Sequence, residues 1–388
     1  MNNKMKLVNY FKTTIIILSM LALNYAKAQD NKPKIAEGII EYHDLFNTSM
    51  KDTVACYRIP TVVTAPNGDL VAIIDERVHD CGDLNTNMNS NIAIRISNDN
   101  GKNWSAIKTI VDYPYGISAS DPSMIVDNIT KEIFLFYNYM DHIKEHNIYF
   151  HYVIKSKDNG KTWSAPLDIT PQITKPEWHN DWMFMTSGGG IQTKSGKLLH
   201  TMANMKRGIF VFGSNDHGNT WFVIDNPINP VDESKIVELS DGSWMINSRV
   251  NKSGIRYIYT SVDEGKVWQT KTDSNLIDPG CNAGFIRYTS VNNGDDKNRL
   301  LFANIKTKVG RKNLCVRISY DEGKTWTEGK QIYAGSAAYS SLTILKNGNI
   351  GLFFEKEDYK ENVFVSFSLE WLIDGKDKSK KKNTQIKR

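Results

Sequence analysis

Three arginines stand in similar settings at widely separated positions of the 388-residue chain: Arg58, Arg249 and Arg311 each lie at the end of a strand-like segment. A guanidinium group stays charged and can bind a carboxylate through two parallel hydrogen bonds. If the fold brings the three together, they predict a binding site for a ligand that carries a carboxylate. Any one of them alone is also consistent with a surface arginine at a strand end.

The elements that must position these residues come from a repeat. The pattern S-x-D-x-G-x-x-W, here called the box, begins at intervals of 47 to 59 residues. Ser and Asp oxygens can accept backbone N–H groups, glycine allows a positive φ, and tryptophan packs its ring over the sheet. The box therefore predicts a tight turn between two strands, and a motif that recurs cannot mark one active site. Its five copies are Ser97–Trp104, Ser156–Trp163, Ser214–Trp221, Ser261–Trp268 and Ser319–Trp326.

Strand-like alternation of apolar and polar residues precedes the boxes, for example at 92–96 and 314–318. Units of about 50 residues built from short strands predict a β-propeller with four antiparallel strands in each blade. Three more strand-like segments follow the last box, at 340–345, 350–354 and 363–369, and a strand near 38–42 can complete their blade. We therefore predict an all-β, six-bladed β-propeller formed by a single domain, residues 35–372.

The two ends of the chain differ from the repeat. Residues 1–28 combine lysines, an apolar stretch too short to span a bilayer comfortably, and an A-x-A cleavage site. They predict a signal peptide and an exported protein, whether periplasmic, cell-surface or secreted; an uncleaved membrane anchor is the alternative. Residues 373–388 are basic and almost free of apolar side chains, which predicts a disordered tail.

The formal net charge of +5 arises in these two ends, and the predicted folded body is net negative. The basic balance therefore indicates no nucleic-acid partner. We expect no stable membrane insertion, although the tail could touch anionic glycans or lipids. Four cysteines, Cys56, Cys81, Cys281 and Cys315, allow three complete pairings, and their spacing neither selects one nor resembles a metal site.

The segment Tyr57-Arg58-Ile59-Pro60, followed by five boxes, resembles the bacterial exo-sialidases, the neuraminidases of the six-bladed propeller type. The resemblance extends from about residue 38 to residue 372. It implies a monomeric, cofactor-free and metal-free retaining exo-α-sialidase that removes terminal sialic acids from glycoproteins or glycolipids through a sialyl-tyrosine intermediate. The alternatives are a trans-sialidase or anhydro-forming sialidase, and a propeller lectin that binds sialoglycans without cleaving them.

By this resemblance, the three arginines bind the sialic acid carboxylate, and Tyr339 is the nucleophile. A neutral phenol avoids the repulsion that a carboxylate nucleophile would meet at the negatively charged substrate. Glu233, sixteen residues before Arg249, resembles the base that accepts the phenolic proton. Asp232 and Glu238 remain alternatives for that base.

The departing glycan needs a proton from an acid on an exposed loop. Asp83 lies where the family carries its acid/base aspartate, and Asp80 is its competitor. The asparagine-rich segment 85–91 differs from the glycine- and aspartate-containing sequence that is more common in the family at this loop.

Three further residues match the family by position. Arg77 and Asp121 correspond to contacts with the C4 hydroxyl of the sugar, although Asp121, which precedes a proline, could instead cap a turn. Glu355 resembles the glutamate that orients Arg58, a buried pairing that would fix the guanidinium.

The glycines of Ser187–Gly190 lack the lysine and helix of a phosphate loop and are expected at the pocket wall. Trp178 and Trp182, just before them, are candidates for an aglycone platform.

Overall fold

The computed structural model describes residues 33–379. The predicted signal peptide, residues 1–28, lies outside them, as do residues 380–388 of the predicted tail. The chain divides into two units, Met1–Ile35 and Ala36–Arg388, and the following description concerns the second. Within the described residues, no helix combines the length and hydrophobicity that crossing a bilayer requires.

Four of the five sheets follow one another along the chain. The first contains β2 (Val54–Thr64), β3 (Leu70–Val78), β4 (Ser90–Ser97) and β5 (Lys108–Val111). The next contains β6 (Ile117–Asp127), β7 (Glu132–Asp141), β8 (Phe150–Ser156) and β9 (Leu167–Asp168), with β11 (Gly188–Gly189) parallel to β6. The third contains β10 (Met183–Met185), β13 (Leu198–Asn204), β14 (Gly208–Ser214) and β15 (Phe222–Val223), with β12 (Ile191–Gln192) also paired to β13. The fourth contains β16 (Ser234–Glu238), β17 (Trp244–Ser248), β18 (Ile255–Ser261) and β19 (Gln269–Ile277).

The fifth sheet has seven strands and joins the two ends of the propeller. It consists of β20 (Gly284–Thr289), β21 (Arg299–Ile305), β22 (Lys312–Ser319), β23 (Lys330–Ile344), β24 (Ile350–Lys356), β25 (Glu361–Phe367) and the N-terminal strand β1 (Glu41–Asn47). The long strand β23 pairs with β22 through its first half and with β24 through its second half. If β23 is divided between two groups, the sheets give six four-stranded groups, but the count of six blades stays a prediction.

Helical segments are short and few among the described residues: α2 (Thr170–Ile173), α3 (Leu369–Leu372), and the 3-10 turns η1 (Pro176–Trp178) and η2 (Val291–Asn293). Past α3, Asp377 accepts hydrogen bonds from Arg299 and Lys297. The beginning of the predicted tail is therefore tied to the propeller.

Each box is the turn after the third strand of a group, which confirms the turn prediction. In the second box, the Gly160 amide donates to Ser156 Oγ at 2.8 Å, and the Thr162 amide donates to Asp158 Oδ1 at 2.8 Å. Asn159 and Gly160 both have a positive φ, 62° and 90°. The serine and aspartate thus satisfy backbone donors that the reversal of the chain leaves free.

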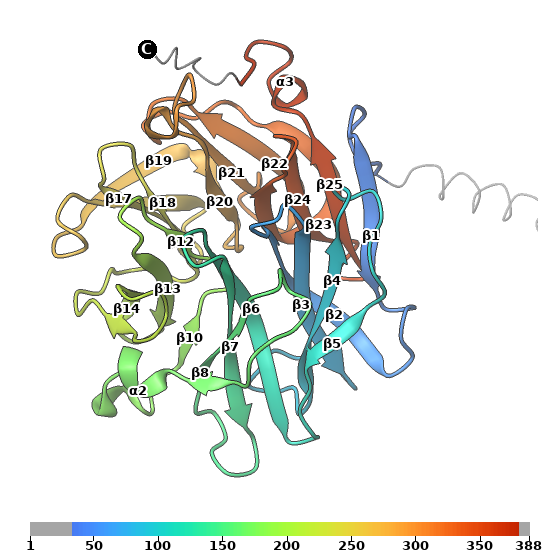
Figure 1. Cartoon of the computed structure of the whole chain (residues 1–388), viewed down its shortest axis with the longest axis vertical. Coiled ribbons are helices and arrows are strands. Elements are labelled where there is room, and N and C mark those ends of the chain that lie inside the picture. The colour runs from blue at the N-terminus through green and yellow to red at the C-terminus, as the bar shows by residue number, and fades with distance from the viewer. Residues whose placement is uncertain (1–32, 380–388) are drawn as a thin grey trace, which may run out of the picture. The chain divides into compact units, whose positions relative to one another are not determined.

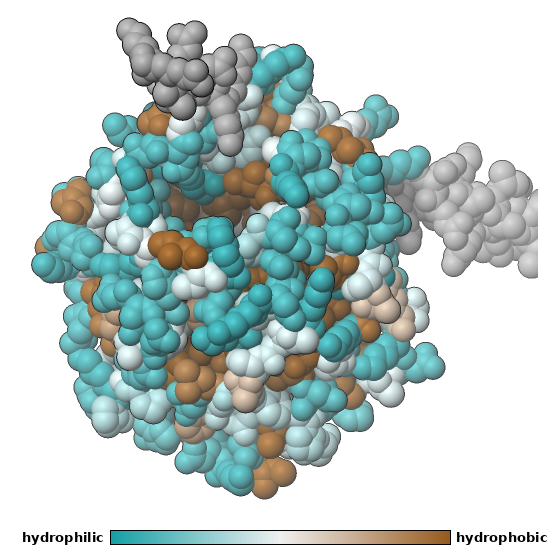
Figure 2. Space-filling view, in the orientation of Figure 1, coloured by the Kyte–Doolittle hydropathy of each residue, from teal (hydrophilic) through white to brown (hydrophobic). Residues whose placement is uncertain are grey.

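The box turns also link consecutive sheets. A methyl group added to Gly160 would meet Val71 of β3 at 3.1 Å, so this box packs on the sheet before its own. Gly101 of the first box lies against Phe364 of β25 in the last sheet, which closes the ring. In Figure 1 the chain colour accordingly runs around the centre until the orange and red strands meet the blue strand β1. Hydrophilic residues cover most of the face in Figure 2, with apolar residues in small groups.

Candidate active site

The structure brings the predicted residues into one cavity of about 460 Å³. They come from the strand ends that lie away from the box turns, since β4 begins after the loop that carries Asp83 and ends at the first box. The cavity is lined by Arg58, Ile59, Arg77, Asp83, Leu84, Asn85, Ser120, Asp121, Tyr149, Trp182, Phe184, Met205, Asp232, Glu233, Arg249, Arg311, Tyr339 and Tyr359. Glu355 is fully buried behind this lining.

Glu355 holds two parts of the site together. Its Oε1 accepts hydrogen bonds from Arg58 Nε at 2.7 Å and from the Ile59 amide at 2.9 Å. Its Oε2 accepts one from the Tyr339 amide at 3.0 Å. The predicted pairing of Glu355 with Arg58 is thus present in the structure, and the same carboxylate also fixes the backbone of Tyr339.

Arg249 bridges the predicted base and nucleophile. Its Nη1 lies 2.6 Å from Glu233 Oε2 and 3.2 Å from the Tyr339 hydroxyl. Burial raises the pKa of Tyr339 well above its ordinary value, and the Glu233 charge adds to this, while Arg249 and Arg311 oppose it. The phenol is therefore neutral in the free protein, beside groups that stabilise its anion.

Arg311, the residue directly before β22, completes the cluster. Its guanidinium carbon lies 5.4 Å from the centre of the Tyr339 ring, and that of Arg58 lies 5.9 Å from the same ring. Among residues 33–379, the hydrogen bonds of the Arg311 side chain are two long ones, to the Tyr359 hydroxyl and the Gly280 carbonyl, both at 3.3 Å. Because no carboxylate of the described part of the chain pairs with Arg311, its donors remain available to an anionic ligand.

Asp83 lies at the rim of the cavity with 77% of its side chain exposed. Arg77 donates to its Oδ1 at 2.8 Å. Desolvation would raise the pKa of Asp83, but the nearby Arg77 and the more distant Arg58 and Arg311 outweigh it, and the pKa is lowered. In the free protein Asp83 is therefore an anion held by Arg77.

A disulfide joins Cys56 on β2 to Cys81 on the Asp83 loop, and within the described residues it is not accompanied by a second bridge, so none of the three complete pairings is formed. Cys281 and Cys315 are buried thiols. The disulfide ties the acid loop to the strand that carries Arg58.

Asp121 is an inner wall of the cavity rather than a turn cap. It has a φ of 59°, its amide donates to Asp75 Oδ1 at 3.0 Å, and its Oδ2 accepts from Asn138 at 3.1 Å. Burial, then the charges of Asp75 and Glu233, raise the pKa of Asp121 well above its ordinary value, against the opposing charge of Arg77. A protonated carboxyl here can donate to a sugar oxygen.

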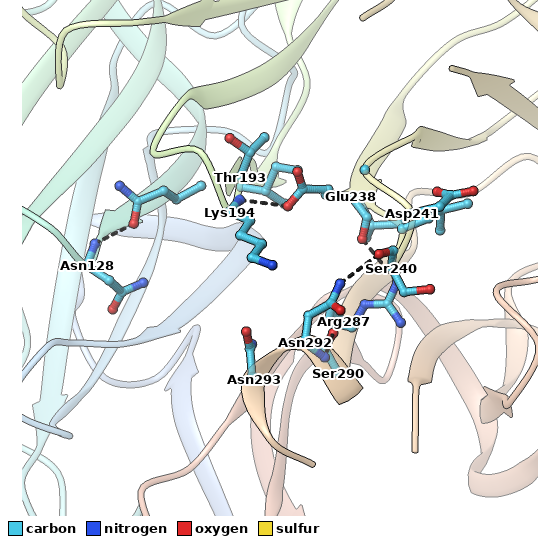
Figure 3. A pocket seen from close by; sticks show the side chains of 15 residues that line it. Asn128, Thr193, Lys194, Glu238, Ser240, Asp241, Arg287, Ser290, Asn292 and Asn293 are labelled. Atoms are coloured by element: carbon cyan, nitrogen blue, oxygen red, sulfur yellow. Dashed lines mark hydrogen bonds between the residues drawn. The ribbon is translucent and has the colours of Figure 1, made fainter. Parts of the chain in front are cut away.

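Two of the alternative acids lie away from this cavity. Asp80 Oδ1 accepts from the Gly82 amide at 2.7 Å within its own loop. Glu238 lines a separate hollow beside the box turns, where its Oε2 accepts from the Lys194 amide at 2.7 Å (Figure 3). Asp232 does line the cavity, but its Oδ2 accepts from Asn251 at 2.6 Å and its Oδ1 from the Glu233 amide at 2.7 Å.

Two expectations about the pocket wall need correction. The glycines at 188–190 do not line the cavity. They line a separate hollow, here called the central channel, together with segments 62–66, 284–287 and 340–344 and Lys235. Trp182 is half-exposed at the rim, as a platform requires, whereas Trp178 is buried among the side chains beneath β13 and β14. The two neighbouring tryptophans therefore have different roles.

Sequence reasoning missed several residues in the cavity lining and one behind it, Asp75. Tyr359 stacks on Arg58, with the guanidinium carbon 3.8 Å from its ring centre. Asp75 is fully buried and accepts from Arg77 Nε and Nη2 at 3.3 and 3.1 Å. Tyr149 and Phe184 join Trp182 along one side. Among residues 33–379, no group of three His, Cys, Asp or Glu side chains is placed to share a metal ion.

Comparison with known proteins agrees with this geometry. Residues 62–352 match the BNR repeat-like domain family. The sialidase of Micromonospora viridifaciens is 34% identical over 349 residues, which cover 81% of this chain and 52% of that protein. The sialidase of Bacteroides fragilis is 27% identical over 333 residues, covering 78% and 60%. The structure of the Hadza microbial sialidase Hz136 matches with a TM-score of 0.74 at 26% identity, covering 83% of this chain and 67% of that one.

An all-β propeller with these repeats defines the chain as a member of the BNR repeat-like domain family. Within it, the chain belongs to the sialidase family. The chain spans a little over half the length of the two curated relatives named above.

Proposed function

We propose that this chain is a retaining exo-α-sialidase that acts as a monomer on terminal sialic acids of glycoproteins or glycolipids. The observation that carries the proposal is the convergence of Arg58, Arg249 and Arg311 on one cavity that also holds Tyr339 and Glu233. Residues 1–28 support the further proposal that it acts outside the cytoplasm, in the periplasm, at the cell surface or after secretion.

The three arginines are proposed to bind the carboxylate on the anomeric carbon. They enter from different parts of the ring, and Arg58 is held by Glu355 at 2.7 Å, so its fork does not have to be ordered by the ligand. The guanidinium N–H groups of Arg311, which no carboxylate of the described chain accepts, would donate to the substrate carboxylate. Positive charge from three sides also favours the anionic sugar over neutral ones.

Tyr339 is the proposed nucleophile. Its oxygen bonds to the anomeric carbon while the bond from that carbon to the glycan oxygen breaks, and its proton passes to Glu233. Arg249 contacts both oxygens and stabilises the negative charge in either position. Because the phenol is neutral before this step, it meets no repulsion from the substrate carboxylate.

Asp83 is the proposed acid and, in the second step, the base. It gives a proton to the departing glycan oxygen and then takes one from the water that displaces Tyr339. In the free protein the pKa of Asp83 is lowered. Because an acid must carry a proton before it can donate one, the bound substrate must raise this pKa. A glycan that covers the exposed carboxylate, and a substrate charge that neutralises the arginines, both act in that direction.

The aromatic rim favours a second candidate. The half-exposed Trp182, with its ring centre 6.2 Å from that of Phe184, stands beside Tyr149 at the mouth of the cavity. Such a surface can hold an acceptor sugar or exclude water, as a trans-sialidase or an anhydro-forming enzyme requires. A lectin without catalysis is less well supported, because candidates for acid, base and nucleophile all line one cavity.

A fluorogenic sialoside assay, followed by NMR of the first product, tests the proposal. We expect free sialic acid that appears first as the α-anomer, and Tyr339→Phe should lower turnover by several orders of magnitude while substrate still binds. A first-formed β-anomer would exclude the double displacement. Transfer to added lactose, or a 2,7-anhydro product, would instead favour the second candidate.

A further inference from the structure

A line of buried hydrogen bonds runs from Glu233 away from the substrate cavity. Ser187 Oγ lies 3.3 Å from Glu233 Oε1, and Asn282 Nδ2 lies 2.6 Å from Ser187 Oγ. At the far end, Lys235 Nζ lies 2.7 Å from Asn282 Oδ1. All four side chains are at most 4% exposed. The arrangement therefore connects the proposed base to a lysine on the other side of the cavity wall.

The chemistry of the end groups gives this line one direction. A lysine ammonium can only donate, and the Ala283 amide also donates to Asn282 Oδ1, at 2.8 Å. The Asn282 amide nitrogen must then face Ser187 and donate to its oxygen. The Ser187 hydroxyl is left to donate to the carboxylate, so every link delivers a donor toward Glu233.

Lys235 reaches its place through a gap in the glycine segment. It lines the central channel, and a methyl group on Gly188 would meet Lys235 Cε at 2.9 Å. Gly188 has a φ of 105°, a conformation that favours glycine. The glycines thus leave room for the lysine. The channel shares Ile191 and Gln192 with the hollow in Figure 3.

We propose that Ser187, Asn282 and Lys235 are positioning residues that hold the Glu233 carboxylate aimed at Arg249 and Tyr339. The inference rests on the proposed function. Ser187 donates to Glu233 Oε1, and Arg249, which also contacts the Tyr339 hydroxyl, donates to Oε2. The second lone pair of Oε2 can receive the phenolic proton. The lysine at the end of the line supplies both the direction of the hydrogen bonds and a positive charge.

Other charges also face this line, and they act with Lys235. Arg249 after β17 and Arg256 on β18 are cations near Glu233, whereas Asp232 and Asp121 are carboxyl groups near it. Burial lowers the pKa of Lys235 to about 8, opposed by Glu233, Asp121 and Asp232 and assisted by Arg256. The lysine is therefore mostly charged at neutral pH.

Ser187→Ala tests the link that touches Glu233. The link is long, 3.3 Å, so we expect kcat/KM for a fluorogenic sialoside to fall by roughly 2- to 10-fold, as for an ordinary hydrogen bond, mainly in kcat. The acidic limb of the pH profile should move to higher pH, because the ionised base loses a donor. The matched control is Ser123→Ala on β6, since the buried Ser123 hydroxyl has no hydrogen-bond partner within the described chain.

Lys235→Met tests the far end, because it keeps the length of the side chain and removes the charge. It should move the acidic limb in the same direction, whereas Lys194→Met, in the hollow of Figure 3, should not. An acidic limb unchanged in both Ser187→Ala and Lys235→Met, with wild-type cleavage intact, would overturn this inference alone. A wild-type protein that cleaves no sialoside would overturn the proposed function as well.

Discussion

At the scale of single residues, Glu355 couples the carboxylate clamp to the nucleophile. A buried carboxylate is costly unless its oxygens are well satisfied, and here they accept from Arg58, the Ile59 amide and the Tyr339 amide. Ile59 has a φ of 63°, which is strained for a β-branched side chain. The bond from Glu355 to its amide holds that conformation, so the positions of the arginine and the tyrosine depend on each other.

Arg311→Lys should be far from conservative. Lysine keeps the charge but loses the fork, so we expect kcat/KM to fall by roughly 10- to 150-fold, the loss of one hydrogen bond to a charged group. The melting temperature should hardly change, because the hydrogen bonds of Arg311 within the protein are long, 3.3 Å.

Lys312→Ala is the control, because Lys312 is adjacent and exposed and is expected to be nearly neutral. Equal damage from both substitutions, or an Arg311→Lys protein that mainly unfolds, would show that the third arginine is wrongly assigned.

Local sequence predicted only part of the site. Arg58 stands in a short motif, which made it and its partner Glu355 recognisable. Tyr359 has no such motif and reaches Arg58 through three successive residues of positive φ, from Glu357 to Tyr359. The pairing of Cys56 with Cys81 depends on a Cα separation of 5.7 Å that only the folded chain defines.

At the scale of elements, the box is a turn stabilised by its own side chains. Asp158 accepts hydrogen bonds from the Thr162 hydroxyl and amide, which hold the pKa of Asp158 at about 2. This folded value lies below the ordinary 3.8. The stabilisation is therefore fully present above about pH 4 and is lost as the pH falls through 2.

Asp158→Ala should lower the free energy of unfolding at pH 7 by about 1 kcal/mol, the size of a typical lost capping interaction. Urea denaturation at pH 7 and near pH 2 should show the difference shrinking in acid, since the wild-type aspartate is then protonated. Asp112→Ala, at an exposed position, is the control. A difference that persists in acid would mean that the carboxylate is not the stabilising form.

At the scale of the whole propeller, the repeat predicted the turns and most strands but not the connections between sheets. β23 runs on for 15 residues and pairs on both sides, so the strand that the sequence predicted at 340–345 is the last part of a longer strand that begins at Lys330. The closing strand was expected near 38–42 and is β1, Glu41–Asn47. The position of the closing strand depends on long-range pairing with β25, which no local pattern encodes.

Phe46 on β1 packs where the first and last sheets of the ring meet. Its ring lies 5.3 Å from that of Tyr57 on β2 and 6.0 Å from that of Phe353 on β24, and it is fully buried between the first and last sheets. Phe46→Ala should therefore lower the free energy of unfolding by about 3 to 5 kcal/mol, measured by urea denaturation. Tyr42→Ala on the same strand, at a side chain 45% exposed, should cost much less. Because Tyr57 adjoins Arg58, the Phe46→Ala protein should also lose sialoside binding and tertiary signal at the same urea concentration. If instead both variants cost the same, or Phe46→Ala leaves stability unchanged, β1 does not close the ring.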